Sequence, residues 1–376
     1  MTRTVAVGVV VLCLLATPGR AAGQEPGESA PAAASPAQTP APPASTDEHG
    51  MPTDAPTLHI RGFTDIDFAQ TDHDEAVPNG FSVGQFVLHL SSSLGHKVSF
   101  FGETSFTARS NTYTVEVERV ILRYDYNDHF KISVGRYHTP INYWNTTYHH
   151  GLWLQTTIDR PDMIKGGGTF QPVHFVGLLA EGLLTSPTLG LGYNAGVGNG
   201  RGEIISRAGD AGDANTNRAW VGKLYSRPAA LYGLELGTAV YHDLVPVADT
   251  PGFPELIASA YVALTRETPE VIAEFSHVRH HDQTSNLDYN SHAFYVQVAS
   301  RLPNAPKWKP YARFERLKGD ADDPVFGALD STISTAGVRY ELTDLAALKG
   351  EYRHTKRIGE PYVNGVYAQV AFTFGD

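Results

Sequence analysis

Polar and apolar residues alternate along most of the chain, and the pattern is clearest at its end. In residues 366–376, Val366, Ala368, Val370, Phe372 and Phe374 form an apolar set, and the residues between them are mostly polar. A period of two is that of a β-strand whose two faces meet different surroundings. On a soluble protein such a terminal strand would leave an unprotected sheet edge.

The same alternation predicts sixteen strands between residue 57 and the end of the chain. They cover residues 57–68, 81–93, 96–107, 114–127, 129–137, 170–184, 187–196, 217–226, 231–242, 255–265, 270–279, 290–301, 308–318, 331–342, 345–355 and 361–374. Tight connections alternate with long ones along most of the chain, as in transmembrane barrels. We therefore predict an all-β fold, a transmembrane antiparallel β-barrel of about 16 strands, whose last strand pairs with the first.

Aromatic residues support a barrel over a soluble β-sandwich, which would also alternate. If odd-numbered strands run away from the periplasm, several aromatic residues fall at one level near the periplasmic rim, as in the aromatic girdle of membrane barrels. They are Tyr124, Tyr126, Phe130, Tyr340 and Phe374. A sandwich would not place them at a common level.

The N-terminal part of the chain differs from the barrel domain, residues 57–376. Residues 1–23 combine a positive start, an apolar run and small residues before a cleavage site, which is typical of a Sec signal peptide. Cys13 lies inside the apolar run, whereas a lipoprotein needs cysteine at the cleavage site. Residues 24–56 are rich in Pro, Ala and Ser, which predicts a disordered linker. Cell-wall or partner binding by this linker stays open.

Composition narrows the functional classes. The formal net charge is −11, and Cys13 is the one cysteine. An acidic exported chain is a poor candidate for binding nucleic acid. Removal of the signal peptide leaves no cysteine, which excludes disulfides and thiolate metal sites from the mature chain. We expect no cofactor.

One stretch carries a family resemblance. The run FKISVGRYHTP lies within ILRYDYNDHFKISVGRYHTPINYWN, which predicts a strand, a tight turn, a second strand and a long loop. With the signal peptide, the sixteen strands and the final alternating strand, this unit resembles the Gram-negative outer-membrane porins, and among them the group that includes the phosphate-selective porins. Gly375 and Asp376 are a departure, because they follow the aromatic residue on which porins usually end.

The resemblance implies a channel in the outer membrane of a Gram-negative bacterium, reached through the Sec pathway. Its partners would be outer-membrane lipid, small polar solutes and the barrel-assembly machinery. The sequence leaves a homotrimer open.

The resemblance also implies that the long loop, residues 138–169, enters the barrel and narrows it. Its many aromatic residues need a surface on which to pack. Charges at a narrow point of a channel set its selectivity, although the same residues can instead clamp the loop to the wall. The candidate constriction residues are His149, His150, Asp159, Arg160, Asp162 and Lys165.

For His149 and His150, we expect polar packing rather than a metal site. Neighbours in an extended loop point in opposite directions, and no suitably spaced carboxylate is evident in the sequence. The acidic loop at residues 318–330 is read as solvated, because it lacks the glycine and distal glutamate of an EF-hand loop. A weak calcium contact there is the alternative.

The predicted lumen wall carries charges of both signs. The candidates are Arg119, Arg123, Lys131, Arg313, Glu315, Arg339, Glu341, Lys349, Glu351 and Arg353. Across residues 313–353 the signs alternate, so we expect cross-strand Arg–Glu pairs that brace the wall. The alternative is a transverse field that orients solutes. The near balance of charge argues against phosphate selectivity, and the acidic total predicts a weak preference for cations.

The function predicted from these features is passive diffusion of small polar solutes through an outer-membrane channel. The alternative is a non-transport barrel that binds a surface ligand or sheathes a partner. We expect no enzyme activity, because no Ser/His pairing at strand spacing suggests a hydrolase.

Overall fold

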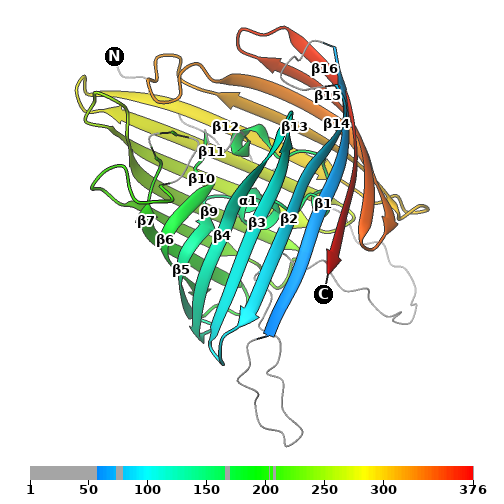
Figure 1. Ribbon diagram of the computed structural model, residues 1–376, viewed down its shortest axis with the longest axis horizontal. Coiled ribbons are helices and arrows are strands. Elements are labelled where there is room, and N and C mark those ends of the chain that lie inside the picture. The colour runs from blue at the N-terminus through cyan, green and yellow to red at the C-terminus, as the bar shows by residue number, and fades with distance from the viewer. Residues whose placement is uncertain (1–56, 73–78, 166–169, 203, 206–208, 376) are drawn as a thin grey trace, which may run out of the picture. The chain divides into compact units, whose positions relative to one another are not determined.

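The described part of the chain is a closed antiparallel barrel. The structure, a computed structural model, describes residues 57–72, 79–165, 170–202, 204–205 and 209–375. Each strand pairs with its neighbours in sequence, and β1 pairs with β16 (Figure 1). The strands are β1 (Thr57–Thr71), β2 (Gly80–Ser93), β3 (Val98–Arg109), β4 (Thr112–Asn127), β5 (Phe130–His138), β6 (His174–Leu183), β7 (Leu191–Asn199), β8 (Ala219–Ser226), β9 (Leu234–Val245), β10 (Phe253–Thr265), β11 (Glu270–Asp282), β12 (Leu287–Ala299), β13 (Trp308–Lys318), β14 (Asp330–Thr343), β15 (Ala346–Arg357) and β16 (Tyr362–Gly375).

The predicted all-β barrel is confirmed, and each predicted strand overlaps an observed one. The signal peptide, residues 1–23, the linker, residues 24–56, and Asp376 lie outside the described residues. Within the described residues, no helix is long and apolar enough to span a bilayer.

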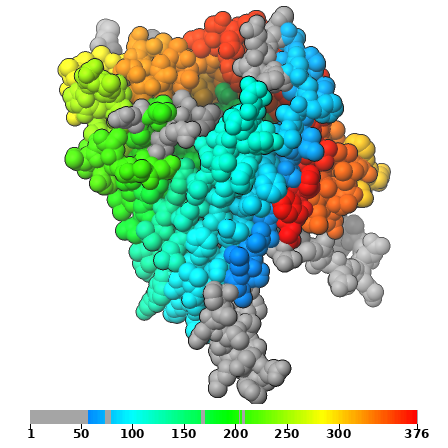
Figure 2. Space-filling view, viewed as in Figure 1, coloured from blue at the N-terminus to red at the C-terminus, as the bar shows by residue number. Residues whose placement is uncertain are grey.

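The final strand closes the barrel. Phe372 of β16 is the register partner of Thr64 in β1, and Gly375 that of Arg61. The blue N-terminal strand and the red C-terminal strand lie side by side (Figure 2). A closed barrel has no free edge, which removes the liability of an alternating terminal strand. Gly375 therefore belongs to the closing strand. A Cβ there would lie 2.3 Å from the carbonyl oxygen of Ile60.

The two faces of the wall differ as the alternation predicts. On the outer face, Phe275, Val296 and Phe314 are exposed large apolar side chains from neighbouring strands. Residues of the other parity, such as Glu274 and Gln297, are buried inside. An exposed apolar belt on a closed barrel is the surface that a membrane barrel presents to lipid. Among the predicted girdle residues, Tyr124, Tyr126, Phe130 and Phe374 are exposed.

We predict that an arginine in the middle of this belt is strongly destabilising. Val296→Arg should lower the free energy of unfolding by roughly 2–4 kcal/mol, because a charged side chain on the outer face at mid-depth is surrounded by lipid and cannot be hydrated. Urea unfolding of the protein folded into lipid vesicles measures this. Asn290→Arg, on the same face of β12 but near the opposite end of the strand, is the matched control and should cost about 0–1 kcal/mol. Equal costs at the two positions would contradict a lipid-facing β12.

Two short helices interrupt the segment between β5 and β6. They are α1 (Tyr143–Tyr148) and the 3₁₀ helix η1 (Asp162–Ile164). The side chain of Asn142 caps α1 by accepting a hydrogen bond from the backbone N–H of Asn145. Trp144 and Ile164 are fully buried. The segment is therefore a packed structure, and the extended loop predicted around His149 and His150 is wrong.

Candidate functional site

The segment 139–165, which we call the inner loop, is anchored to the wall at its N-terminal end. The backbone N–H groups of Tyr143 and Trp144 donate to the carboxylate of Glu274 on β11, at 2.8 and 2.9 Å. The indole of Trp144 packs edge-on against Tyr295 of β12, with ring centroids 5.9 Å apart. These contacts join a loop that starts from β5 to strands well around the barrel.

Three basic wall residues bind backbone carbonyl groups farther along the inner loop. Arg313 of β13 donates to the carbonyl of Asp159 at 2.7 Å. Arg339 of β14 donates to the carbonyl groups of Trp153 and, at 2.8 Å, Gln155. Lys349 of β15 donates to the carbonyl groups of Leu152 and Thr157, at 2.5 and 2.9 Å. The three side chains satisfy carbonyl groups that a loop away from water would otherwise leave unpaired.

Acidic wall residues bind the complementary backbone groups. Glu351 accepts a hydrogen bond from the N–H of Ile158 at 3.1 Å, and Glu315 accepts one from the N–H of Asp162 at 2.5 Å. Five of the predicted wall residues thus bind the backbone of the inner loop directly. Of the other two on these strands, Arg353 contacts the carboxylate of Asp159 at 3.3 Å, and Glu341 pairs with Arg339 at 2.9 Å. The observed contacts are those of a clamp.

The expected cross-strand bracing is wrong in its geometry for residues 313–353. Arg313 pairs with Glu315 at 2.7 Å, two residues along the same strand, and Arg339 with Glu341 repeats this spacing. Arg353 and Glu351 form a third such pair. The register opposes Arg339 to Lys349 and Arg313 to Thr335, so opposite charges do not face each other directly across these strands. Side chains two residues apart share one face of a strand, which permits the pairing along it.

The charged residues of the inner loop are also paired. Asp159 contacts Lys165 at 2.5 Å and Arg353 at 3.3 Å. Burial opposes ionisation of Asp159, but Lys165 and Arg353 together hold the pKa of this carboxyl well below its usual range. Asp162 accepts from Ser331 at 2.5 Å and lies 3.4 Å from Arg357. Lys165 keeps the most exposed side chain of these groups, at 44%.

On the opposite part of the wall, the remaining predicted residues lie on β4 and β5. Arg119 pairs with buried Glu103 at 2.5 Å, and Arg123 contacts Asp125 at 2.5 Å. Lys131 lies opposite Asp125 in one neighbouring strand and Glu181 in the other. The basic residues of this side are therefore accompanied by acids.

A cluster of histidines lies where the inner loop meets β4, β5 and β6. His138 ends β5 and faces His174, the first residue of β6, in the strand register. His149 and His150 follow α1, and their rings lie 4.3 Å apart between centroids. Ligand atoms of Glu118, His138, His149 and His150 lie within 4.8 Å of one another, and all four residues are buried.

The surroundings of His149 and His150 differ from the prediction in two respects. His149 and His150 follow a helical turn, so their rings do not point in opposite directions, and Glu118 of β4 supplies the nearby carboxylate. Burial lowers the pKa of His149, and the neighbouring His138 and Arg160 lower it further. Nη2 of Arg160 donates to the carbonyl of His149 at 3.0 Å, which holds the cluster against the rest of the loop.

The acidic loop, residues 319–329 between β13 and β14, is tied to the barrel by a buried charge network. Asp323 accepts from His280 at 2.7 Å, and His280 contacts Glu255 at 3.0 Å. Glu255 in turn pairs with Arg201 at 2.9 Å. The second oxygen of Asp323 accepts from the N–H of Val325 at 2.9 Å. Asp323 thus has protein partners on both oxygens.

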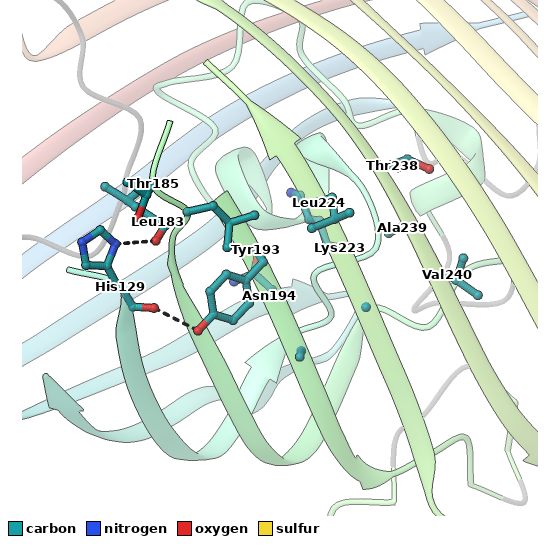
Figure 3. Close-up of a pocket in the computed structure, with 13 residues that line it drawn as sticks. His129, Leu183, Thr185, Tyr193, Asn194, Lys223, Leu224, Thr238, Ala239 and Val240 are labelled. Carbon is teal, nitrogen blue, oxygen red and sulfur yellow. Dashed lines mark hydrogen bonds between the residues drawn. The ribbon is translucent and has the colours of Figure 1, made fainter. Parts of the chain in front are cut away.

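A cavity of about 770 Å³ is formed over β6 to β9, where exposed Leu224 and Val240 belong to the lipid-facing side (Figure 3).

Residues 80–84 read GFSVG, the pattern of a hydrolase nucleophile elbow, but such an elbow needs a strand-to-helix turn. Ser82 instead lies within β2, opposite Asp67 of β1.

No protein-family model and no curated protein sequence matches the chain. Solved structures do resemble it. The anion-selective porin from Comamonas acidovorans has a TM-score of 0.62 at 11% identity, covering 85% of this chain and 100% of that one. Salmonella typhi OmpF in complex with daunomycin gives 0.61 at 11% identity, covering 85% of this chain and 98% of that one. The chain has the fold of an outer-membrane porin.

The outer membrane channel DcaP of Acinetobacter baumannii has the same porin fold, with a TM-score of 0.58 at 11% identity, covering 88% of this chain and 99% of that one. A porin barrel with a lipid-facing apolar belt supports the predicted location in the outer membrane of a Gram-negative bacterium. Because the identities are so low, the likeness carries the barrel architecture and no individual site residue.

Proposed function

We propose that the protein is an outer-membrane channel for passive diffusion of small polar solutes, constricted by the inner loop. The observation that carries this is the set of backbone hydrogen bonds that attach the loop to β11, β13, β14 and β15 after it leaves β5. A loop attached to inward-facing residues on both sides of a closed barrel reduces the open cross-section. A small polar solute then passes only through the remaining aperture.

The loop residues proposed to line this aperture are those that keep exposed charge. The side chains of Lys165 and Asp159 are 44% and 28% exposed, whereas Arg313 and Glu351 are buried against the loop. Lys165 and Asp159 form an ion pair, so they present a dipole rather than a net charge to a passing solute. We therefore infer that the aperture discriminates mainly by size and polarity.

The channel is not expected to be specific for phosphate. A phosphate channel would need basic side chains free to bind the anion in the lumen. Arg313, Arg339 and Lys349 are instead occupied by carbonyl groups of the inner loop. The resemblance to the phosphate-selective group therefore concerns the architecture and does not imply the same substrate.

Planar-bilayer recording tests the channel directly. The purified, folded protein is expected to give discrete conductance steps, with a weak preference for cations that follows from its acidic balance of 40 Asp and Glu against 29 Lys and Arg. The reversal potential in a KCl gradient measures the preference. Anions that are more permeant than cations would contradict the predicted selectivity. Absence of both conductance steps and sugar uptake into proteoliposomes would contradict the channel itself.

A further inference from the structure

The histidine cluster contains buried polar atoms that have no hydrogen-bond partner among the described residues. They are Oε2 of Glu118 and the Nε2 atoms of His138, His150 and His174. Buried polar atoms in proteins are nearly always hydrogen-bonded, so four orphaned ones in one place need an explanation. Glu118, His138 and His150 are each no more than 7% exposed, which leaves water little access to them.

These atoms lie in one small region between the inner loop and the wall. Oε2 of Glu118 lies 3.2 Å from Nε2 of His150 and 2.8 Å from Nε2 of His174, without a hydrogen bond of normal geometry. The ring of His138 lies 5.7 Å from that of His150 and 5.5 Å from that of His174. Where a ring nitrogen carries no proton, its lone pair and the carboxylate oxygen repel each other at this distance, and a cation bound between them would turn the repulsion into coordination.

The outer contacts of the cluster leave the same atoms free for a ligand. Nδ1 of His150 is 3.1 Å from Oε1 of Gln85, which fixes Nδ1 as the donor and turns the lone pair of Nε2 toward Glu118. Ser105 donates to Oε1 of Glu118 at 2.6 Å, which leaves Oε2 for the cluster. Metal-binding histidines and carboxylates are oriented by outer hydrogen bonds of this kind.

We propose that Glu118, His138 and His150 bind a divalent transition-metal ion of the Zn²⁺ class, with the fourth position supplied by a neighbouring histidine. Two imidazole nitrogens and a carboxylate oxygen are a donor set that Zn²⁺ prefers, whereas Ca²⁺ and Mg²⁺ prefer oxygen ligands alone. His149 belongs to the group whose ligand atoms lie within 4.8 Å of one another, and His174 is the alternative fourth donor through its orphaned Nε2, 2.8 Å from Oε2 of Glu118.

The competing explanation is a cluster of protonated histidines that neutralises Glu118 without a metal. The nearby cations already have partners: Arg119 pairs with Glu103, and Arg136 pairs with Asp210 at 2.7 Å while lying 3.7 Å from Oε2 of Glu118. Several imidazolium ions with rings 4.1–5.7 Å apart would repel one another in a buried site. A single divalent ion satisfies the orphaned atoms at once.

The site joins the inner loop to the wall. Glu118 belongs to β4, His138 to β5 and His150 to the loop, so a bound ion would fasten the loop on the side opposite the Arg313, Arg339 and Lys349 anchors. Any effect of the ion on conductance rests on the proposed channel function. Binding of the ion does not, and the two can be measured separately.

Metal binding is tested on the mature protein, purified without a histidine tag and folded in detergent. Isothermal titration with Zn²⁺ is expected to show one site per chain, and Co²⁺ to give the visible absorption of a tetrahedral complex. Glu118→Gln, His138→Gln and His150→Gln should each weaken Zn²⁺ binding by more than 100-fold. Gln85→Ala, which changes only an outer contact, should weaken it by roughly 10–100-fold.

Two controls separate this site from adventitious binding. His96→Gln removes a histidine from an exposed turn and should leave binding unchanged. His277 and His292 face each other on the outer wall, so all titrations are repeated in the His277→Gln/His292→Gln background. His149→Gln and His174→Gln identify the fourth ligand, since one of the two should weaken binding as strongly as His150→Gln.

The proposal is overturned if the wild-type protein binds no Zn²⁺ in the micromolar range, or if Glu118→Gln and His150→Gln bind as tightly as wild type. Folding of each variant is checked by its heat-modifiable migration on gels. If a histidine variant does not fold, Gln85→Ala and Glu118→Gln carry the test. A protein that binds Zn²⁺ but gives no conductance steps would refute the channel and leave the metal site standing.

Discussion

Replacing Arg313, Arg339 and Lys349 together with glutamine is expected to release the inner loop and raise the single-channel conductance several-fold. These side chains bind carbonyl groups of residues 152–160 from three adjacent strands. A hydrogen bond to a charged group stabilises by roughly 1.5–3 kcal/mol, so loss of three such anchors should greatly weaken the attachment of residues 152–160 to the wall. Conductance in planar bilayers measures the open cross-section directly.

The same substitutions away from the loop provide the control. Arg316, Lys318 and Lys356 lie on β13 and β15, and Arg316 is occupied by Asp330, outside the inner loop. Their triple glutamine variant removes the same number of positive charges and should keep the wild-type conductance. If both triple variants conduct like wild type, the inner loop does not limit the channel. If both conduct more, the change comes from charge rather than from release of the loop.

The barrel could be predicted from the sequence because its signal is local. The period of two in residues 366–374 predicts which face of β16 contacts lipid. The observed register with β1 agrees with that prediction. The same holds for the short turn between Asn127 and Phe130, which fixes β4 and β5 as neighbours. Strand identity, alternation and neighbour pairing require no knowledge of distant residues.

The contacts inside the barrel could not be predicted in the same way. Arg339 and Lys349 bind backbone carbonyl groups more than 180 residues away, and a carbonyl group leaves no mark on a sequence. The histidine cluster needs Glu118, His138, His150 and His174 to meet from three strands and a loop. The sequence does contain one indication of the cluster. His138 and His174 flank the long loop, and they are register partners if β5 ends at His138 and β6 begins at His174.

Removal of the buried guanidinium of Arg201 is expected to produce the largest loss of stability from a single substitution. Arg201, Glu255 and His280 are at most 2% exposed, and Arg201 also donates to the carbonyl of Phe170 at 3.0 Å. Arg201→Met leaves the Glu255 carboxylate buried with only His280 as a partner, which costs about 3–5 kcal/mol when a buried pair is broken from one side. Urea unfolding in lipid vesicles, followed by tryptophan fluorescence, measures the loss.

The double variant Arg201→Met/Glu255→Met distinguishes a broken charge pair from a simple packing defect. Replacing both partners by apolar side chains of similar volume is often close to neutral, because neither charge is then left uncompensated. His280 retains Asp323, at 2.7 Å, in that variant. The double variant should therefore be more stable than Arg201→Met alone. If the two substitutions instead destabilise additively, Arg201 acts through its contacts with Phe170 and Ile205, and the network is not what fastens the acidic loop to the barrel.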